Sequence, residues 1–206
     1  MKKMGIFGGT FNPIHKGHIH LALYLRERLA LDEILVIPAN IPPHKECPDL
    51  APAKERLEMC RLACRPYPFL RVSDIEIRHT GASYTYDTLV ELKENFPDSQ
   101  FYLMMGSDMF LSFERWRRYQ EIMKLAVLCT APREEGQASA MEKAAVRYRI
   151  QGAQVELLEE MQVLELSSTE VRRQLGNSQE SGGLLDRQVE QYILEKGLYQ
   201  PQESLR

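Results

Sequence analysis

An apolar strand that ends in two glycines and leads directly into a helix is the feature that most constrains this chain. The run Lys3–Phe7 stops at Gly8-Gly9, and apolar side chains then recur at helical spacing from Lys16 to Leu29. The next strand-length segment is Glu33–Pro38, in which Ile34–Ile37 is a continuous apolar run, typical of a strand buried on both faces. This order predicts a βαβ unit with parallel strands and a right-handed crossover.

The rest of the chain continues the alternation of strand-length apolar runs and helical periodicities. The further predicted strands are Leu70–Val72, Ile75–Ile77, Gln100–Met105, Leu125–Thr130, Val155–Leu158 and Gln162–Leu166. The further predicted helices are Ala53–Ala63, Thr85–Phe96, Ala138–Ile150, Ser168–Leu175 and Asp186–Lys196, with short helical pieces before Met123. Between the second strand and the second helix, Pro38–Pro52 is rich in proline and predicts a surface loop of the kind that often forms a lid or a binding loop.

This pattern predicts an α/β fold: a Rossmann-like parallel sheet with helices on both faces and a small helical C-terminal part. Because no internal repeat or long linker divides the chain, we expect residues 1–206 to form a single domain, with about 166–206 as its C-terminal helical part. Ligands of such folds bind beyond the carboxyl ends of the strands, where the strand order reverses. The segments after Phe7, Ile37 and Met105 are therefore the most informative.

The composition excludes several other classes of protein. With 206 residues, 44% of them hydrophobic, the chain can form one substantial core. Its net charge of −3 argues against a broad polyanion-binding surface, so we expect no nucleic-acid partner. No apolar run approaches the roughly 18 residues of a membrane span, and Gly8-Gly9 interrupts any signal-like start, so we expect a cytoplasmic protein without a membrane partner. A homo-oligomer is compatible with the sequence.

The four cysteines do not form a familiar metal-binding pattern. Cys47, Cys60, Cys64 and Cys129 contain no C-x-x-C pair, although the middle two lie one helical turn apart. A zinc site made from the first three and a nearby histidine is the alternative, but this spacing matches no common finger or ribbon. We interpret them as reduced packing cysteines.

The segment between the first strand and the first helix carries the strongest chemical signal. Two glycines let a ligand approach the backbone, and the following helix start offers N–H groups and the positive end of its dipole. His15 and His18 are three residues apart across that helix start, so their rings can point to the same side and donate to phosphate oxygens. The alternative is a glycine-rich turn with two surface histidines. The segment is neither a G-x-G-x-x-G nor a Walker loop.

At this point the sequence resembles a known family. Residues 8–18, GGTFNPIHKGH, are similar to the HxGH signature of the nucleotidyltransferases, which couple a nucleoside triphosphate to a phosphorylated acceptor. Three later segments, IPPHK at 41–45, SYTYDTL at 83–89 and LSSTEVR at 166–172, resemble the bacterial-type nicotinate-mononucleotide adenylyltransferases. The resemblance runs from Met4 to Tyr199 and covers nearly the whole chain.

The resemblance implies three sets of site residues. The implied catalytic residues, which would stabilise charge on the transferred phosphate and the leaving pyrophosphate, are His15, His18 and Arg172. The implied ATP-binding residues are Gly8, Gly9, Thr10, Phe11, His18, Gly106, Ser107, Asp108, Ser167, Ser168, Thr169 and Arg172. The implied mononucleotide-binding residues are Asn12, His44, Lys45, Tyr84, Thr85 and Trp116. No dedicated metal ligand is expected, because Mg²⁺ would be held mainly by phosphates and water, with Asp108 acting through water.

Several of these residues also have ordinary structural interpretations. Ser83 and Thr85 precede or begin a helix and could be caps, and the same holds for Ser107 and Asp108. The order of residues 167–170 fits a capping box, which can coexist with an anion site. Lys45 could be a solvated surface lysine, and Trp116 could be a core residue.

The chain departs from the family pattern in two places. Asn12 stands where the family usually has Asp, which leaves a hydrogen-bonding group but removes a charge and any role as a base. Arg133 lies in Pro-Arg-Glu where family members commonly have Arg-Pro-Gly, so we assign it no role.

The resemblance implies transfer of the adenylyl group of ATP to nicotinate mononucleotide, with Mg²⁺ as cofactor, giving nicotinate adenine dinucleotide and pyrophosphate in NAD biosynthesis. Two alternatives stay open. One is the same reaction on nicotinamide mononucleotide or phosphopantetheine. The other is a non-catalytic nucleotide-binding module, which Asn12 alone favours.

Overall fold

The computed structural model describes residues 1–42, 49–132, 136–158, 166–177 and 181–200. Within these ranges one parallel sheet has the strand order β3-β2-β1-β4-β5-β6. Its strands are β1 (Lys2–Gly9), β2 (Glu33–Pro38), β3 (Leu70–Val72), β4 (Ser99–Met104), β5 (Ala126–Thr130) and β6 (Val155–Leu157). The chain starts in the centre of the sheet, builds outward on one side through β3, and then returns to β4 on the other side of β1. This is the doubly wound order of Rossmann folds.

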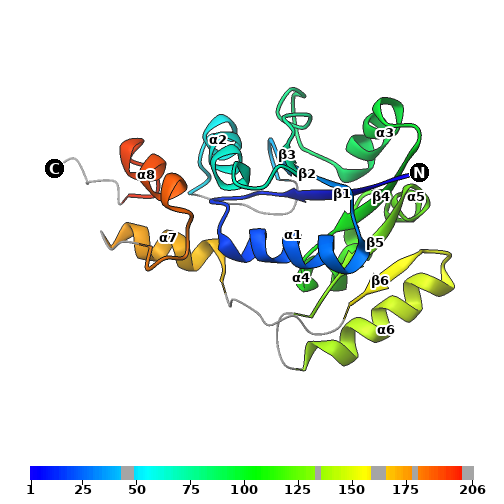
Figure 1. The fold of residues 1–206 in the computed structure, drawn as a ribbon. Helices are drawn as coiled ribbons and strands as arrows, with labels where there is room; N and C mark the ends of the chain where they lie inside the picture. Colours follow the sequence, from blue (N-terminus) through cyan, green and yellow to red (C-terminus); the bar gives the residue numbers. More distant parts are fainter. Residues whose placement is uncertain (43–48, 133–135, 159–165, 178–180, 201–206) are drawn as a thin grey trace.

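Eight α-helices connect and extend these strands in the described part of the chain (Figure 1). They are α1 (Lys16–Leu29), α2 (Ala53–Cys64), α3 (Thr85–Asn95), α4 (Ser107–Leu111), α5 (Tyr119–Leu125), α6 (Gln137–Ile150), α7 (Ser168–Gly176) and α8 (Arg187–Glu195). A single 3₁₀ turn covers Phe113–Arg115. The predicted fold class, with helices on both faces and a helical C-terminal part, is confirmed.

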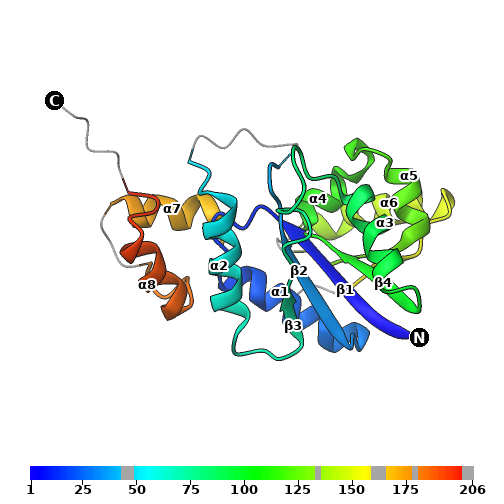
Figure 2. The ribbon, with the colours of Figure 1, turned by 90° about the horizontal axis from the view of Figure 1, so that it is seen from above.

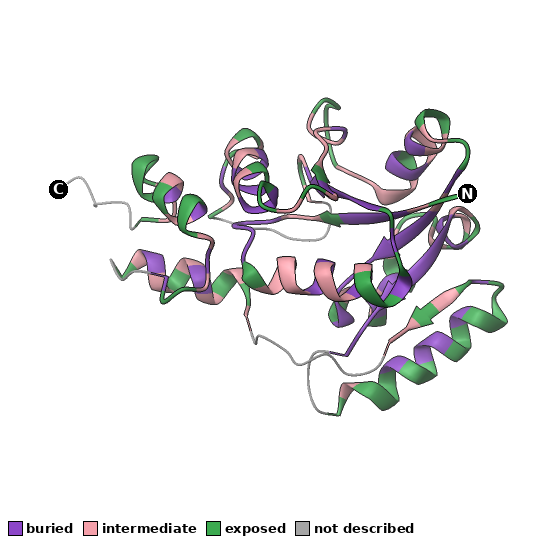
Figure 3. Ribbon diagram, viewed as in Figure 1, coloured by how far each residue is buried: buried purple, intermediate pink, exposed green. Residues whose placement is uncertain are grey.

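Side-chain alternation along the buried strands separates two hydrophobic cores. In β4, Tyr102 and Met104 face the core shared with α1, α2, α7 and α8, whereas Phe101 and Leu103 face the core shared with α3 to α6. Figure 2 shows α1 and α2 on one side of the strands and α3 to α6 on the other, with α8 beside α2. Figure 3 shows the central strands buried along most of their length. Burial on both faces explains why these strands read as continuous apolar runs.

Most predicted elements agree with the structure to within a few residues, but the strand expected at Ile75–Ile77 is wrong. The sheet contact ends where Ser73 N–H donates to the carbonyl of Val36. The chain then turns, because the carbonyl of Asp74 accepts from the N–H groups of Ile77 and Arg78 at 2.9 and 3.0 Å. Ile75 is buried in this turn, so its apolar side chain serves the core without a strand.

Two other predicted segments need comment. The strand expected at Gln162–Leu166 lies almost wholly outside the described residues and stays a prediction. In the proline-rich loop, Ile41 forms a parallel bridge with Ala82, a short pairing that the sequence did not predict. Along the described ranges, no helix has both the length and the apolar character needed to cross a membrane.

A buried carboxylate at the amino end of the sheet predicts a pH-dependent stability. Glu33 pairs with Lys2 and with Arg71, the latter at 2.8 Å. Burial raises its pKa, but hydrogen bonds and charges from the two cations outweigh this, and the pKa lies below its ordinary value of 4.5. Because the pKa is lower in the folded state, ionised Glu33 stabilises the fold above pH 4.5. This stabilisation is lost as the pH falls through the pKa of the folded state.

We therefore expect Glu33→Gln to lower the free energy of unfolding by about 1 kcal/mol at pH 7, a modest value because both cations are partly exposed. The difference from the parent protein should shrink toward pH 3. Urea titrations at pH 7, 5 and 3 measure it, and a difference that grows on acidification would contradict the assignment.

Candidate active site

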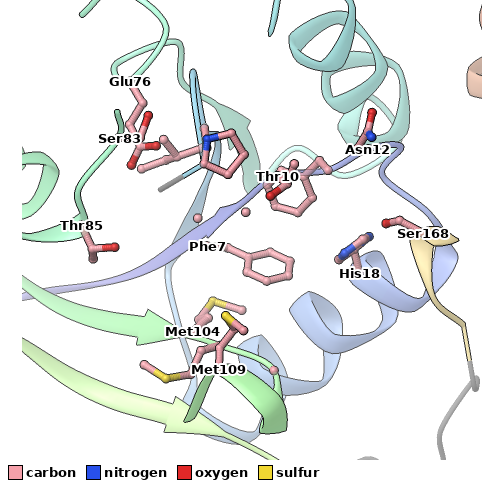
Figure 4. A pocket seen from close by; sticks show the side chains of 18 of the residues that line it. Phe7, Thr10, Asn12, His18, Glu76, Ser83, Thr85, Met104, Met109 and Ser168 are labelled. Carbon is pink, nitrogen blue, oxygen red and sulfur yellow. The ribbon is translucent and has the colours of Figure 1, made fainter. Parts of the chain in front are cut away.

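A cavity of about 400 Å³ lies at the carboxyl edge of the sheet, where β1 and β4 are neighbours. The chain leaves β1 toward α1 on one face and leaves β4 toward α4 on the other, so the two connections diverge and open the cavity. Figure 4 shows Phe7, Met104 and Met109 at its floor, with His18 and Ser168 on one side and Thr85 and Glu76 on the other.

The histidine pair lies at the start of α1, as predicted. The two imidazole centroids are 3.7 Å apart, and both rings line the cavity. His15 is buried and His18 half-buried. The backbone N–H of His15 donates to Nδ1 of His18 at 3.2 Å, which makes Nδ1 the acceptor and assigns the ring proton of neutral His18 to Nε2. His18 can therefore donate Nε2–H to a ligand oxygen.

The side chain of Asn12, between β1 and α1, hydrogen-bonds to distant parts of the chain. Its Nδ2 donates to the carbonyl of Asp49 at 3.0 Å, and its Oδ1 accepts from the N–H of Ala51 and from the hydroxyl of Tyr199 at 3.0 and 2.7 Å. A carboxylate could not donate to Asp49, so the amide at this position suits its surroundings. Burial raises the pKa of Tyr199, against the effect of the charges of Arg56 and Arg172, which keeps its hydroxyl a donor at neutral pH.

The C-terminal part closes one wall of the cavity. Arg172 on α7 donates to the carbonyl of Asn12 at 2.9 Å, and the hydroxyl of Ser168 donates to the carbonyl of Pro13 at 3.1 Å. Ser167 caps α7 by accepting from the N–H of Glu170 at 3.1 Å, which is one half of the predicted capping box. The Glu170 carboxylate instead accepts from Arg173 and Gln174. Residues 167–169 and Arg172 also line the cavity, so the cap leaves room for the anion site, which stays a prediction.

The opposite wall is built at the start of α3. Tyr84 and Thr85 line the cavity there, and Ser83 does not cap the helix. Instead, the Ser83 hydroxyl accepts from the N–H of Asn40 at 2.9 Å. Glu76 accepts from the hydroxyl of Thr88 at 2.8 Å. Burial raises the Glu76 pKa, partly opposed by hydrogen bonds from the Thr88 and Ser83 hydroxyls.

The third predicted segment follows β4. Gly106 and Asp108 line the cavity, whereas Ser107 is buried at the first residue of α4 and is not among the described lining residues. Trp116 is half-buried, and its contact with a substrate base stays a prediction. Its ring packs against Phe113, with centroids 5.4 Å apart, and it also lines the cavity.

The structure thus brings together nearly all of the predicted site residues that it describes. His44, Lys45 and Arg133 lie outside the described residues. The sequence reasoning missed four residues of the lining that can form polar interactions: Glu76, Ser83, Thr88 and Arg117. Glu76 stood in the wrongly predicted strand, and Arg117, whose guanidinium lies 4.6 Å from the Tyr84 ring centroid, carried no motif.

The described residues contain no cluster of three or more histidine, cysteine or acidic side chains that could hold a metal ion. Cys60 and Cys64 are buried free thiols, and burial raises the pKa of both. For Cys64 it rises to about 12. These properties are those of packing cysteines, and Cys47 lies outside the described residues.

Helix starts, imidazoles and a guanidinium all bind anionic oxygens, and the switch point is where such sheets bind nucleotides. The fold and the cavity therefore define the class of nucleotide-binding α/β proteins. Comparison with known proteins narrows this class. The cytidylyltransferase-like family model matches residues 6–174.

Proteins described as probable nicotinate-nucleotide adenylyltransferases align over nearly the whole chain. The one from Dehalococcoides mccartyi is 40% identical over 97% of this chain and 98% of its own. The one from Lachnoclostridium phytofermentans is 36% identical over 97% of this chain and 100% of its own. The chain belongs to the cytidylyltransferase-like nucleotidyltransferases, in the group of nicotinate-nucleotide adenylyltransferases.

A solved structure has the same fold. The nicotinic acid mononucleotide adenylyltransferase of Plasmodium falciparum, complexed with NaAD, superimposes with a TM-score of 0.76 at 20% identity. The alignment covers 97% of this chain and 98% of that chain.

Substitutions at two glycines of β1 are expected to affect different properties, ligand binding at Gly8 and stability at Gly5. A Cβ on Gly8, which lines the cavity, would meet nothing within 4 Å, whereas a Cβ on Gly5 would lie 2.7 Å from Sδ of Met104. We expect Gly8→Ala to keep the melting temperature and to weaken ATP binding about tenfold, or about 1.4 kcal/mol, because the backbone can no longer approach the ligand.

Gly5→Ala is the matched control, expected to lower stability by about 1–3 kcal/mol through overpacking. Thermal melts and calorimetric ATP titrations of both variants measure the two effects. Unchanged ATP affinity in Gly8→Ala would contradict the placement of the nucleotide.

Proposed function

We propose that this chain transfers the adenylyl group of ATP to nicotinate mononucleotide, releasing nicotinate adenine dinucleotide and pyrophosphate. One observation carries the proposal. The cavity has His18 and Ser168, from the starts of α1 and α7, on one wall and Thr85, from the start of α3, on the other, and Trp116 also lines it. The two walls suit two different phosphorylated substrates that must meet between them. The family membership supports the same reaction.

The reaction needs no covalent enzyme intermediate. A phosphate oxygen of the mononucleotide attacks the α-phosphorus of ATP, and a new P–O bond forms. The bond from that phosphorus to the oxygen bridging the α- and β-phosphates breaks, and pyrophosphate leaves with the electron pair. The attacking phosphate is already ionised at neutral pH, so catalysis consists of positioning and charge stabilisation.

On the nucleotide wall, the side chains of His18 and Arg172 stabilise the developing negative charge, and His15 positions His18. His18 donates through Nε2. The backbone N–H of His15 donates to Nδ1 of His18 and so holds the His18 ring in place. Arg172 is oriented by its bond to the carbonyl of Asn12 and presents the rest of its guanidinium fork to the triphosphate. Gly8 and Gly9 let the backbone lie close to the phosphates.

On the mononucleotide wall, the backbone amides at the start of α3 bind the nicotinate carboxylate. Tyr84 and Thr85 lie there, and an anion at a helix N-terminus is favoured by the helix dipole. The Trp116 ring packs against the pyridine. His44 and Lys45 are proposed to contact the substrate phosphate, as predicted from the sequence.

Nucleotidyltransferases of this family generally use a divalent metal with ATP, and here we assign Mg²⁺. The donor set fits a metal that arrives with its nucleotide. Asp108 is an exposed carboxylate of the cavity lining and can hold a metal-bound water. When bound, Mg²⁺ neutralises phosphate charge.

The C-terminal helical part belongs to the same domain in this proposal. Ser168, Arg172 and Tyr199 all hydrogen-bond to the Asn12-Pro13 turn. The nucleotide wall is incomplete without them.

Removal of the His18 imidazole tests the catalytic assignment. We expect His18→Ala to lower kcat about a hundredfold or more, because one charge-stabilising donor is lost. The melting temperature should change little, since the ring is only half-buried. Pyrophosphate release with ATP and nicotinate mononucleotide measures the rate. His20→Ala, on the same helix but outside the described lining, is the control and should match the parent. Near-parent activity of His18→Ala would refute the role.

A competition between acceptors tests the substrate. With nicotinate and nicotinamide mononucleotides at equal concentration, we expect the acid to be used preferentially, because only a carboxylate carries the charge that the α3 start favours. Mass spectrometry of the two dinucleotide products gives the ratio. Preference for nicotinamide mononucleotide would contradict the proposed acceptor. In a separate assay, turnover of phosphopantetheine in place of both mononucleotides would contradict it too. ATP binding without any pyrophosphate release would favour the non-catalytic alternative.

A further inference from the structure

Arg56 is a fully buried arginine on α2, at 0% exposure. It lies outside the cavity lining and in none of the motifs that the sequence singles out. A buried guanidinium is costly unless its donors are matched by acceptors in the right places. The hydrogen-bond acceptors around Arg56 therefore indicate which segments its side chain positions.

Three hydrogen bonds of Arg56 reach backbone carbonyls of three separate segments. Nε donates to Ala51 at 2.9 Å, one terminal nitrogen donates to Thr10 at 2.7 Å, and the other donates to Asn40 at 2.8 Å. The guanidinium is a rigid planar fork, so these bonds fix the three carbonyls relative to one another.

Two of the three segments support opposite walls of the active site, and the third connects to Asn12. Thr10 follows the two glycines on the nucleotide wall. Asn40 leads to the mononucleotide wall, because its N–H donates to the Ser83 hydroxyl and the carbonyl of the next residue accepts from the N–H of Ser83 at 3.0 Å. Ala51 leads to Asn12, whose Oδ1 accepts from its N–H. One side chain thus connects the supports of both substrates.

We propose that Arg56 is a positioning residue for adenylyl transfer, which sets the separation between the two walls by holding the carbonyls of Thr10 and Asn40 on one rigid guanidinium. The inference rests on the proposed function, since only a reaction between two bound substrates depends on that separation. A displacement of about 1 Å between reacting groups can cost about a hundredfold in rate.

If the role of Arg56 is purely structural, the expected effects of its substitution on stability and on kcat are different. Loss of packing or of hydrogen bonds would lower stability, yet the enzyme that remains folded would turn over normally. A positioning role lowers kcat of the folded enzyme. It changes KM less, because each wall can still bind its own substrate.

Arg56→Lys tests the proposal because it keeps the charge but not the planar fork. We expect kcat to fall at least tenfold, with KM for ATP and for nicotinate mononucleotide each changing less than threefold. Arg61→Lys on the same helix is the matched control. Arg61 is exposed and pairs with Glu58, so its kinetics should equal those of the parent. Rates are expressed per folded enzyme, with the folded fraction taken from circular dichroism.

Ser83→Ala is the second variant, and it removes the acceptor of the Asn40 N–H without touching Arg56, whereas the bond from the Ser83 N–H to the carbonyl of Ile41 remains. It should lower kcat several-fold, and in the double variant with Arg56→Lys the two losses should be less than additive. Parent-like kcat in folded Arg56→Lys overturns the proposal, even if its melting temperature falls. If Arg56→Lys does not fold, Ser83→Ala decides, and an unchanged kcat overturns the proposal. A parent enzyme that releases no pyrophosphate with any acceptor refutes the proposed function instead.

Discussion

The pairing of β1 with β4 is the constraint on which the rest of this structure depends. β1 pairs with β2 on one side and with β4 on the other, all three in parallel. The chain that leaves β1 packs on one face and the chain that leaves β4 packs on the other, so backbone cannot fill the edge between them. The cavity and the starts of α1 and α4 in its lining follow from this divergence, and the starts of α3 and α7 complete the lining.

A chain of net charge −3 can bind a triphosphate because the binding groups are local. Backbone amides and helix dipoles do not appear in a charge count, and a neutral imidazole can also donate one hydrogen bond. Among the described residues, Arg172 and Arg117 line the cavity, and the buried Arg56 donates to the carbonyl of Thr10, which also lines it. The net charge therefore excludes a broad polyanion surface and says little about a pocket for one nucleotide.

The central strands could be predicted from sequence because burial on both faces leaves an unbroken apolar run, as in Ile34–Ile37 of β2. The same pattern gave a wrong strand at Ile75–Ile77, because the buried Ile75 lies in a turn that is closed by hydrogen bonds to the carbonyl of Asp74. The helix starts of the site were predicted because each motif is contiguous in the sequence. Arg56 and Ser83 were not assigned their roles, because their partners are separated by up to 46 residues and only the fold brings them together.

The most direct test of the account is a crystal structure of this chain with nicotinate adenine dinucleotide. We expect the pyridine carboxylate against the backbone amides of Tyr84 and Thr85, with the ring beside Trp116. The pyrophosphate should lie between the two walls, within hydrogen-bonding distance of His18 Nε2 and Arg172. A dinucleotide bound with its pyrophosphate away from the edge between β1 and β4 would contradict the account.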